Sequence, residues 1–367
     1  MYINRHKLEV NSDIAERLQT FISSDLYSAH SPIAKSEYWK YEGTKFQTSV
    51  TGNYVNIAGD IGYDVPSKSS FLEHNIQRAI RVITQPSRVI NRVKRIFSSF
   101  FEVPRMMSYE QAFDAAMRHD EIADVDLSRF RVNHRELSKL KNVFIDTSSV
   151  KKHYENWSGY KADAGIILFH YYQNILRGYI SETEVKTILE IGAGNGNFPA
   201  IFHHDWSPER IILVDLPETL AIAITFLSNL FPDANILTPN EARSNGLEGE
   251  YDFVFLTVDQ LDLIPANAID LAINCHSFME MTHEQINVYF DLIQRASREA
   301  GYFFTANRAE KIPCDENAFT VEQLAPPNRF AEYPWKKGNE VLVYEVSRLS
   351  RLVQLDDISL RLERIHK

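Results

Sequence analysis

The chain has 367 residues, of which 44% are hydrophobic, and a formal net charge of −10 at pH 7. This length can form one large α/β domain and a smaller one, and the acidic balance argues against broad attraction to nucleic-acid phosphates. Two cysteines, Cys275 and Cys314, are too few for a disulfide framework and lack the spacing of a zinc site.

The sequence also argues against secretion and membrane insertion. The first residues, MYINRHKLEVNSD, lack the apolar core of a signal peptide, and no run approaches the roughly eighteen apolar residues of a membrane span. We therefore expect a cytoplasmic protein without a transmembrane segment, either soluble or peripheral to a membrane.

Residues 1–150 are expected to form a mainly helical N-terminal region. Residues 37–69 mix aromatic residues with glycines and prolines, which indicates irregular structure or a hairpin, and the spacing is helical from Ser108 to about Tyr179. Residues 78–97 place five arginines on one predicted helical face. Such a face either contacts an anionic membrane surface or an anionic substrate, or is simply solvated.

After Glu184 the pattern changes to apolar runs that alternate with helical segments, as in consecutive βαβ units. Residues 235–239 fit either a further short strand or an insertion. These units predict an α/β sheet in a second domain, residues 151–367. The strands are predicted at Thr187–Ile191, Arg210–Asp215, Asp252–Thr257, Ile269–Asn274 and Gly301–Ala306, and the helices at Asn197–His204, Glu218–Leu230 and His283–Ala300.

Two further predictions concern the C-terminal part. Residues 329–335, RFAEYPW, and residues 340–346, EVLVYEV, flank KKGN and predict an antiparallel hairpin at the sheet edge. Residues 356–367, DDISLRLERIHK, are predicted to form an exposed helix, in which Asp356 and Asp357 cap the N-terminus.

The turn after the first predicted strand contains three glycines, Gly192, Gly194 and Gly196. Parallel sheets bind ligands at the carboxyl ends of their strands, so a cofactor is expected here. A dinucleotide needs the spacing G-x-G-x-x-G, but the last position is Asn197, and Glu190 before the turn would repel a pyrophosphate. A cationic cofactor without phosphate fits better, and S-adenosylmethionine is such a molecule.

Polar residues follow the next two predicted strands. Asp215 ends the second strand, where a carboxylate can accept both ribose hydroxyls of either type of cofactor. Asp259 and Gln260 lie just past the third strand, where they would meet an adenine edge. Each acid has the alternative role of a solvated loop charge, and for Asp259 the two interpretations are equally good.

The segments LEIGAGNG, LVDLPE and DQLDLIPANAIDLAINCHSF resemble motifs of class I S-adenosylmethionine-dependent methyltransferases over about residues 150–345. The segments DFVFLTVDQLDLIP, AIDLAINCHSFMEM and YPWKKGNEVLVYEVSRL are similar, more narrowly, to the sugar O-methyltransferase family. The resemblance implies a Rossmann-like sheet of seven strands, methyl transfer to a saccharide hydroxyl in polysaccharide biosynthesis, and an N-terminal region that shapes the acceptor site. The residues expected to bind the cofactor are Glu190, Gly192, Ala193, Gly194, Gly196, Asp215, Leu216, Asp259, Gln260 and Asn274.

Methyl transfer to a hydroxyl needs a base for the hydroxyl proton, and an imidazole with a pKa near 6.5 suits neutral pH. His276 lies two residues past the predicted end of the fourth strand and is the first candidate; its alternative role is that of a hydrogen-bonded residue in the pocket wall. Glu280 and His283 either orient it or act as the base themselves. Carboxylates that would hold a divalent metal are not grouped near the strand ends, so we expect no metal.

Residues that bind the acceptor must come largely from outside the cofactor-binding strands. The segment before the first predicted strand contains Tyr154, Trp157 and Tyr160, whose faces pack well against pyranose rings. Core packing is the alternative role for each of them. Asn307 and Arg308 follow the fifth predicted strand and are expected to open toward the same pocket.

Three other functions stay open. One keeps S-adenosylmethionine but changes the acceptor to a non-sugar small molecule. Another is an NAD-dependent oxidoreductase, which Asn197 and Glu190 disfavour. The third is an inactive methyltransferase-like binding module. The saccharide itself is either free, nucleotide-linked, lipid-linked or part of a glycan.

Overall fold

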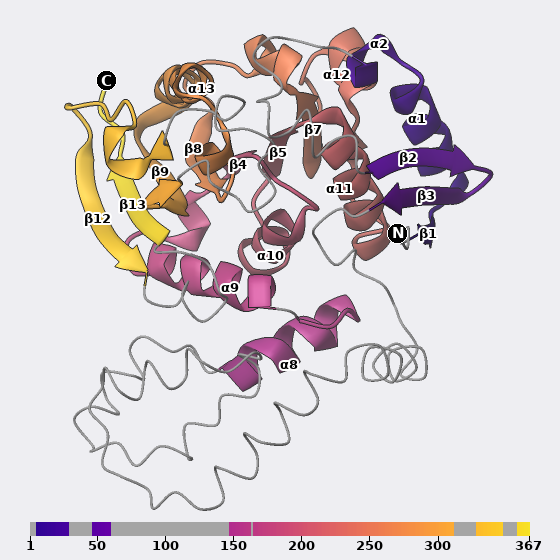
Figure 1. The fold of residues 1–367 in the computed structure, drawn as a ribbon, viewed down its shortest axis with the longest axis horizontal. Coiled ribbons are helices and arrows are strands. Elements are labelled where there is room, and N and C mark those ends of the chain that lie inside the picture. The colour runs from indigo at the N-terminus through magenta and orange to yellow at the C-terminus, as the bar shows by residue number, and fades with distance from the viewer. Residues whose placement is uncertain (1–4, 29–45, 60–146, 163, 312–327, 348–357) are drawn as a thin grey trace, which may run out of the picture. The chain divides into compact units, whose positions relative to one another are not determined.

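The computed structural model describes residues 5–28, 46–59, 147–162, 164–311, 328–347 and 358–367 (Figure 1). Its contacts divide the chain into two units, Met1–Val65 with Gly165–Lys367, and Pro66–Ala164. In the second unit, the described part contains helix α8 (Thr147–Ser158). The basic segment 78–97 lies outside the described residues, and the domain division near residue 150 stays a prediction.

The first unit is built on a large mixed sheet. Its strands are β4 (Thr187–Ile191), β5 (Arg210–Asp215), β6 (Ile236–Leu237), β7 (Phe253–Thr257), β8 (Ile269–Cys275), β9 (Ser297–Arg308), β12 (Glu340–Ser347) and β13 (Ile358–Arg364). In the described part of the chain their order is β12-β13-β9-β8-β4-β5-β7-β6. The strands from β9 to β6 are parallel, whereas β13 is antiparallel to both of its neighbours. The fold is therefore α/β and Rossmann-like, as predicted, but the described sheet has eight strands instead of the expected seven.

Helices cover both faces of this sheet. They are α9 (Ala164–Arg177), α10 (Asn197–Trp206), α11 (Pro217–Leu230), α12 (Pro239–Asn245) and α13 (His283–Ala296). Phe303 and Phe304 are neighbours on β9 and so point to opposite faces. Phe304 packs against Tyr172 of α9, with ring centroids 5.6 Å apart, and Phe303 packs against Phe290 of α13 at 5.4 Å. Because both faces are covered, strands such as β7 are buried along their whole length.

The predicted elements between Thr187 and Ala306 are largely confirmed. β4 and β5 have the predicted bounds, and the short strand β6 occupies part of residues 235–239. Helix α13 ends at Ala296 instead of Ala300, and β9 begins at once with Ser297. Ser297 already has extended backbone angles and Ala300 has a positive φ, so the helix does not continue to the predicted end.

The C-terminal predictions are wrong in two respects. Residues 356–367 were expected to be an exposed helix, but Ile358–Arg364 form the buried strand β13. Ile358, Leu360 and Leu362 alternate along it and are fully buried, which is the two-residue period of a strand. The partner of β12 in the edge hairpin is thus β13.

The predicted first arm of that hairpin instead forms strand β11 (Asn328–Arg329) and the short helix η8 (Phe330–Glu332). β11 pairs with β10 (Glu310–Lys311) in a separate small sheet. Asp356 and Asp357 lie outside the described residues.

The N-terminal segment adds a small sheet and two helices to the first unit. They are β1 (Arg5–Glu9), α1 (Ser12–Ile22), α2 (Asp25–Ser28), β2 (Phe46–Thr51) and β3 (Tyr54–Gly59), with the strand order β1-β3-β2. β2 and β3 form an antiparallel hairpin whose turn has Gly52 at a φ of 58°. Of the two alternatives for residues 37–69, irregular structure or a hairpin, the described part thus has the hairpin. Helix α1 contacts α11 and α12 beside the main sheet (Figure 1).

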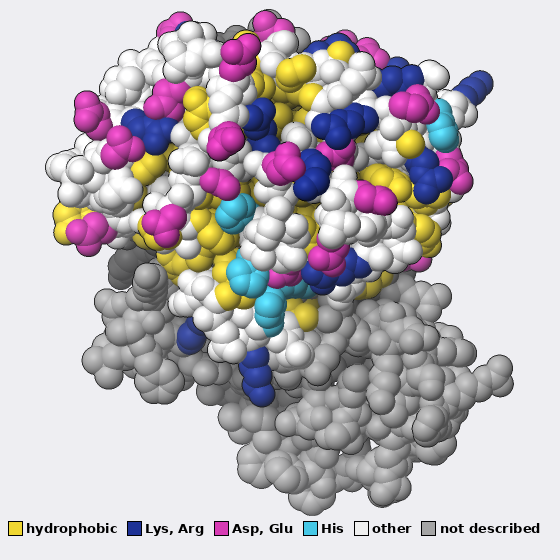
Figure 2. Space-filling view, turned by 180° about the vertical axis from the view of Figure 1, so that it is seen from behind, with side chains coloured by type: hydrophobic (Ala, Val, Ile, Leu, Met, Phe, Trp, Pro, Cys, Tyr) yellow, Lys and Arg dark blue, Asp and Glu magenta, His cyan; other side chains and the backbone are white. Residues whose placement is uncertain are grey.

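Figure 2 shows acidic and basic side chains interspersed over one face of the molecule. Within the described ranges, no helix combines the length and the apolar character needed to cross a membrane.

Candidate active site

The glycine turn lies where the order of the parallel strands reverses direction. The chain continues from β4 to β5 on one side, and β8 lies on the other side. Ligands of open α/β sheets bind at the carboxyl ends of the strands at such a point. The order β7-β5-β4-β8-β9 corresponds to strands 3-2-1-4-5 of a dinucleotide-binding sheet, but the antiparallel strand β13 takes the sixth place. The sheet thus departs from the NAD-binding pattern at its edge.

The three glycines of the turn all have a positive φ, which residues with a side chain rarely adopt. The values are 73° for Gly192, 57° for Gly194 and 87° for Gly196. A Cβ on Gly192 would also collide with the Cβ and Oγ of Ser277, which follows β8. The backbone after β4 and the loop after β8 therefore approach each other closely, and glycine is required there.

Two carboxyl groups flank this turn. Glu190 on β4 is 3% exposed, and in the described part of the chain its Oε2 has no hydrogen-bond partner. Burial and the nearby carboxylate of Asp215 raise the pKa of Glu190 well above its ordinary value. Asp215 accepts hydrogen bonds from the backbone N–H groups of Gly194 (2.8 Å) and Leu216 (2.6 Å). Burial nevertheless raises the pKa of Asp215 to about 7.

Asn274 at the end of β8 connects the strands beneath the site. Its Nδ2 donates to the carbonyl of Ile191 at 2.9 Å and to Ser277 Oγ at 2.5 Å. Its Oδ1 accepts from Asn307 Nδ2 at 2.8 Å, and Asn307 Oδ1 in turn accepts from the backbone N–H of Met279 at 3.1 Å. Asn274 and Asn307 are both fully buried. The amide of Asn307, expected to bind the acceptor, is thus engaged within the protein.

The two residues expected near the adenine have different environments. Gln260 is buried and caps the short helix η5 (Val258–Leu263): its Oε1 accepts from the backbone N–H of Thr257 at 3.0 Å, and its Nε2 donates to the carbonyl of Pro239 at 2.8 Å. Asp259, one residue earlier, is exposed. Asp259 is therefore the more accessible of the two to a ligand.

His276 lies in the loop directly after β8 and has an unusual backbone conformation, with a φ of 62°. Its backbone N–H donates to the carbonyl of Ala306 on β9 at 2.8 Å. Its ring stacks on Tyr172 with centroids 5.9 Å apart, and its Nε2 lies 3.0 Å from the Tyr172 hydroxyl. Burial, together with the positive charge of Arg308, lowers the pKa of His276 to about 4. The imidazole is therefore neutral at pH 7 and can accept a proton, but it is a weaker base than the expected pKa near 6.5 would make it.

The other two candidates for the base lie further along the same loop. Glu280 is in the short helix η6 (Phe278–Glu280) and forms an ion pair with Lys311 Nζ at 3.7 Å. Its charge also contributes to the raised pKa of Asp215, so the two carboxylates lie near each other. His283 is the half-buried first residue of α13.

Tyr172 is the site residue that the sequence reasoning missed. It belongs to AGIILFHYYQNILRGYI, where the helical spacing of apolar residues is typical of a core-facing helix and marks no single tyrosine as functional. Arg308, expected just past the fifth strand, is instead the last residue of β9, and its charge acts on the imidazole of His276.

The aromatic residues before β4 belong to the second unit. Tyr154 and Trp157 on α8 contact each other edge to face, with ring centroids 5.1 Å apart. The backbone N–H of Tyr160 donates to Ser158 Oγ at 3.0 Å. Their role in acceptor binding stays a prediction.

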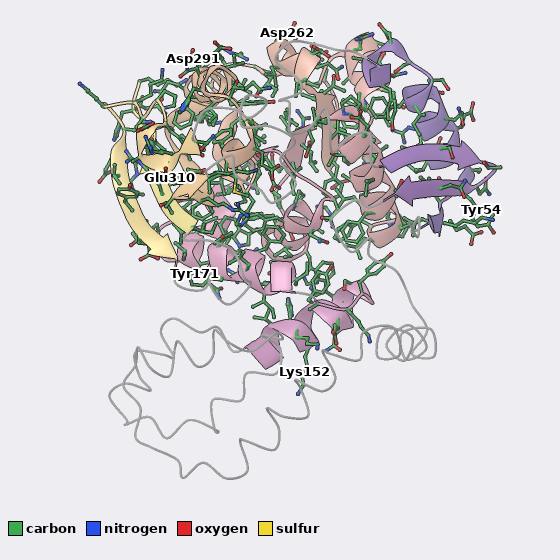
Figure 3. All side chains as sticks on the ribbon, in the orientation of Figure 1. Tyr54, Lys152, Tyr171, Asp262, Asp291 and Glu310 are labelled. Carbon is green, nitrogen blue, oxygen red and sulfur yellow. The ribbon has the colours of Figure 1, made fainter. Side chains whose placement is uncertain are left out.

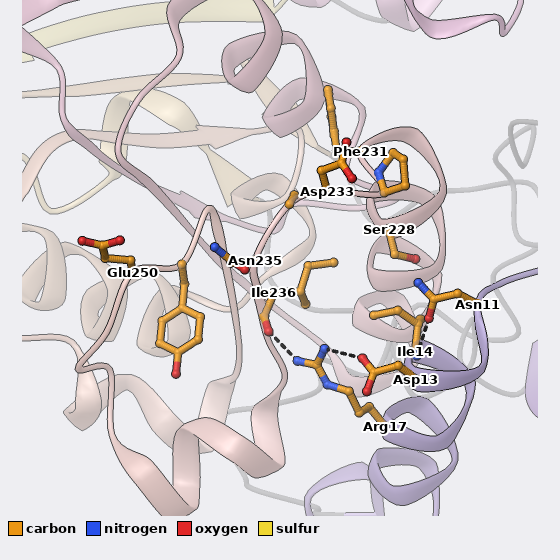
Figure 4. A pocket seen from close by; sticks show the side chains of 13 residues that line it. Asn11, Asp13, Ile14, Arg17, Ser228, Phe231, Asp233, Asn235, Ile236 and Glu250 are labelled. Carbon is orange, nitrogen blue, oxygen red and sulfur yellow. Dashed lines mark hydrogen bonds and ion pairs between the residues drawn. The ribbon is translucent and has the colours of Figure 1, made fainter.

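A polar groove of about 360 Å³ lies away from the glycine turn, before the amino ends of β6 and β7 (Figure 4). It is lined by α1 and by the segment that joins α11 to β6. The guanidinium of Arg17 in this groove is already bound by Asp13, Glu241 and the carbonyl of Ile236. The groove therefore offers structural contacts, and the glycine turn remains the candidate site.

Comparison with known proteins gives distant structural similarities. No protein-family model and no curated protein match the chain. An S-adenosylmethionine dependent methyltransferase from Mesorhizobium loti is 15% identical, with a TM-score of 0.33, over 52% of this chain and 96% of the other. A SAM-dependent methyltransferase from Leishmania major is 12% identical, with a TM-score of 0.37, over 70% and 82%.

Phosphoethanolamine N-methyltransferase 1 from Haemonchus contortus, solved with phosphoethanolamine and S-adenosylhomocysteine, is 13% identical, with a TM-score of 0.34, over 60% of this chain and 49% of the other. Similarities of this size assign no function to this chain.

Proposed function

We propose that this protein is an S-adenosylmethionine-dependent methyltransferase that acts on a hydroxyl group of a saccharide. The observation that carries the proposal is the buried carboxyl of Glu190 beside three glycines of positive φ. The ammonium and sulfonium groups of S-adenosylmethionine would favour the ionised form of this carboxyl and lower its raised pKa, whereas a pyrophosphate would oppose its ionisation.

The residues at the strand ends fit this cofactor. Glu190 has a buried oxygen without a hydrogen-bond partner in the described residues, which a cationic group would satisfy. The Asp215 oxygens each accept one backbone hydrogen bond and keep a lone pair for the ribose hydroxyls. The glycine turn lets a ligand approach the backbone, and the exposed Asp259 is available to the adenine.

The chemistry needs a proton acceptor besides the cofactor. When bound, the cofactor supplies a methyl group on a sulfonium leaving group. The acceptor O–H bond breaks as the new C–O bond forms, and the neutral imidazole of His276 takes the proton. Arg308, whose charge reaches His276, would hold an electronegative part of the acceptor. This division of roles needs no metal.

The saccharide acceptor is the finer part of the proposal. It is supported by the resemblance of residues 252–281 and 333–349 to sugar O-methyltransferases. A non-sugar hydroxyl acceptor is the alternative within the same chemistry.

Thermal unfolding with S-adenosylhomocysteine and with NAD tests the cofactor. A ligand at a hundred times its dissociation constant stabilises a protein by about 2.7 kcal/mol, and we expect this effect from S-adenosylhomocysteine alone. Gly192→Ala, which would collide with Ser277, should lose the effect. Stabilisation by NAD, with none by S-adenosylhomocysteine, would contradict the proposal.

Methyl transfer from labelled S-adenosylmethionine to free, nucleotide-linked and lipid-linked sugars tests the reaction. His276→Asn removes the imidazole but keeps a residue that tolerates positive φ, so turnover should fall by about 10²–10⁴-fold while cofactor binding persists. Binding of S-adenosylhomocysteine without transfer to any acceptor would instead favour an inactive binding module.

A further inference from the structure

The two ring nitrogens of His276 have different surroundings. Nε2 lies 3.0 Å from the Tyr172 hydroxyl. Nδ1 is buried, and in the described part of the chain it has no hydrogen-bond partner. In the tautomer whose Nε2–H donates to the Tyr172 hydroxyl, the free lone pair lies on Nδ1, and a proton can be taken there. Nε2 is therefore the ring nitrogen that is hydrogen-bonded, and Nδ1 is the one without a partner in the described residues.

Tyr172 is itself firmly fixed. It is fully buried on α9, with its ring 6.4 Å from the ring of Phe198 on α10 and 5.6 Å from that of Phe304 on β9. Among the described residues its hydroxyl has one hydrogen-bond partner, His276. Loss of this hydrogen bond would leave a buried hydroxyl without a partner, which costs free energy. The contact therefore holds the Tyr172 hydroxyl and His276 Nε2 together.

We propose that Tyr172 is a positioning residue, whose hydroxyl oxygen accepts the Nε2–H of His276 and so leaves the lone pair of Nδ1 for the proton of the methyl acceptor. This inference rests on the proposed function. As the acceptor O–H bond breaks, its proton moves to Nδ1, its oxygen forms the bond to the methyl carbon, and the electron pair of the broken C–S bond stays on sulfur. His276 becomes an imidazolium.

The hydrogen bond to Tyr172 strengthens as this charge appears, because a bond from a charged donor is stronger than one from a neutral donor. The other groups that face the ring act against the charge or are neutral. Arg308 at the end of β9 repels it, and the adjacent thiol of Cys275 is buried with a raised pKa and stays protonated. The hydrogen bond to Tyr172 thus favours the imidazolium, whereas burial and Arg308 oppose it.

Nitrogen-15 NMR of histidine-labelled full-length protein tests the positioning role without an acceptor. The shifts of Nδ1 and Nε2 report which nitrogen carries the proton, and the His276→Asn variant assigns the signals. We expect the Nε2–H form in the wild-type protein at pH 7. In Tyr172→Phe the ring stays but the hydroxyl is lost, and the ratio of the Nε2–H to the Nδ1–H form should fall about tenfold, as expected for losing one hydrogen bond.

Tyr171→Phe is the matched control, because it makes the same chemical change one residue away on the same helix (Tyr171 is labelled in Figure 3). It should leave the His276 signals unchanged. A purely structural role for Tyr172 would also leave them unchanged in Tyr172→Phe, because the aromatic packing is retained. That result, or an Nδ1–H form in the wild-type protein, would overturn the proposal.

Stabilisation by S-adenosylhomocysteine, measured on the same samples, separates this proposal from the proposed function. We expect the wild type and both tyrosine variants to be stabilised equally. If none is stabilised, the methyltransferase assignment fails, and the positioning role that rests on it fails too. If all are stabilised but the tautomer ratio does not change, the positioning role alone is wrong.

Discussion

The carboxyl of Asp215 has two backbone donors and yet a pKa of about 7. The two hydrogen bonds favour the charged form, but burial favours the neutral form more strongly, and the nearby Glu218 and Glu280 add repulsion. In the free protein at neutral pH, Asp215 is therefore divided between its protonated and ionised forms.

Affinity for S-adenosylhomocysteine should consequently depend on pH. Ribose hydroxyls donate to the ionised carboxylate, so the ligand prefers that form and lowers the pKa of Asp215. Affinity should reach its maximum above about pH 8 and should fall by up to tenfold for each pH unit below 7. Calorimetric titration between pH 5.5 and 8.5 measures this slope. Asp215→Asn should bind more weakly and with a shallower slope, because the raised pKa of Glu190 still contributes, and a flat wild-type profile would place the ribose elsewhere.

At the residue scale, the site could be predicted where its residues lie next to strand ends. Glu190, the glycines and Asp215 follow from local spacing, and the structure places Glu190 and Asp215 beside the glycine turn. Tyr172 is 104 positions from His276 in the sequence, and only tertiary packing of α9 brings them together. Strand position alone also could not indicate that the Asn307 amide is engaged by Asn274 and Met279.

At the element scale, β13 shows why the C-terminal prediction failed. The sequence ISLRLER places charged residues between apolar ones, and charged residues are usually exposed, which favoured an amphipathic helix. In the structure Glu363 is 1% exposed, but Arg361 Nε donates to its Oε1 at 2.7 Å and Asn339 Nδ2 to its Oε2 at 3.0 Å. Paired charges can occupy buried positions in a strand, and a pattern of residue types does not show the pairing.

Leu360→Ala tests the assignment of β13. Leu360 is fully buried between β9 and β12, so its truncation should lower the free energy of unfolding by about 2–5 kcal/mol. Val341→Ala on β12 is the control, because Val341 is 45% exposed and should cost less than about 1 kcal/mol. Denaturant unfolding of the two variants measures the difference. A cost near zero for Leu360→Ala would be expected of an exposed helix and would contradict the strand.

At the scale of the whole molecule, the N-terminal segment and the main sheet form one unit although about 100 residues of the other unit separate them in the sequence. Helix α1 packs on α11 and α12. Arg17 of α1 forms hydrogen bonds to α12 and to β6. Its guanidinium donates to both carboxylate oxygens of Glu241, at 2.8 and 2.7 Å, and to the carbonyl of Ile236. Spacing within the sequence gave no indication of this long-range docking.

The contribution of the Arg17–Glu241 contact to stability can be compared with that of Arg243, which also links the N-terminal segment to α12. Arg17 is 22% and Glu241 34% exposed, so the paired hydrogen bonds are partly shielded from water, and Arg17→Ala should lower the free energy of unfolding by about 1–3 kcal/mol. Arg243 on α12 pairs with Asp25, which is 82% exposed and fully screened by water, so Arg243→Ala should leave the midpoint of urea unfolding nearly unchanged. Equal midpoints of urea unfolding for the two variants would show that the N-terminal segment is held by apolar packing of α1 alone.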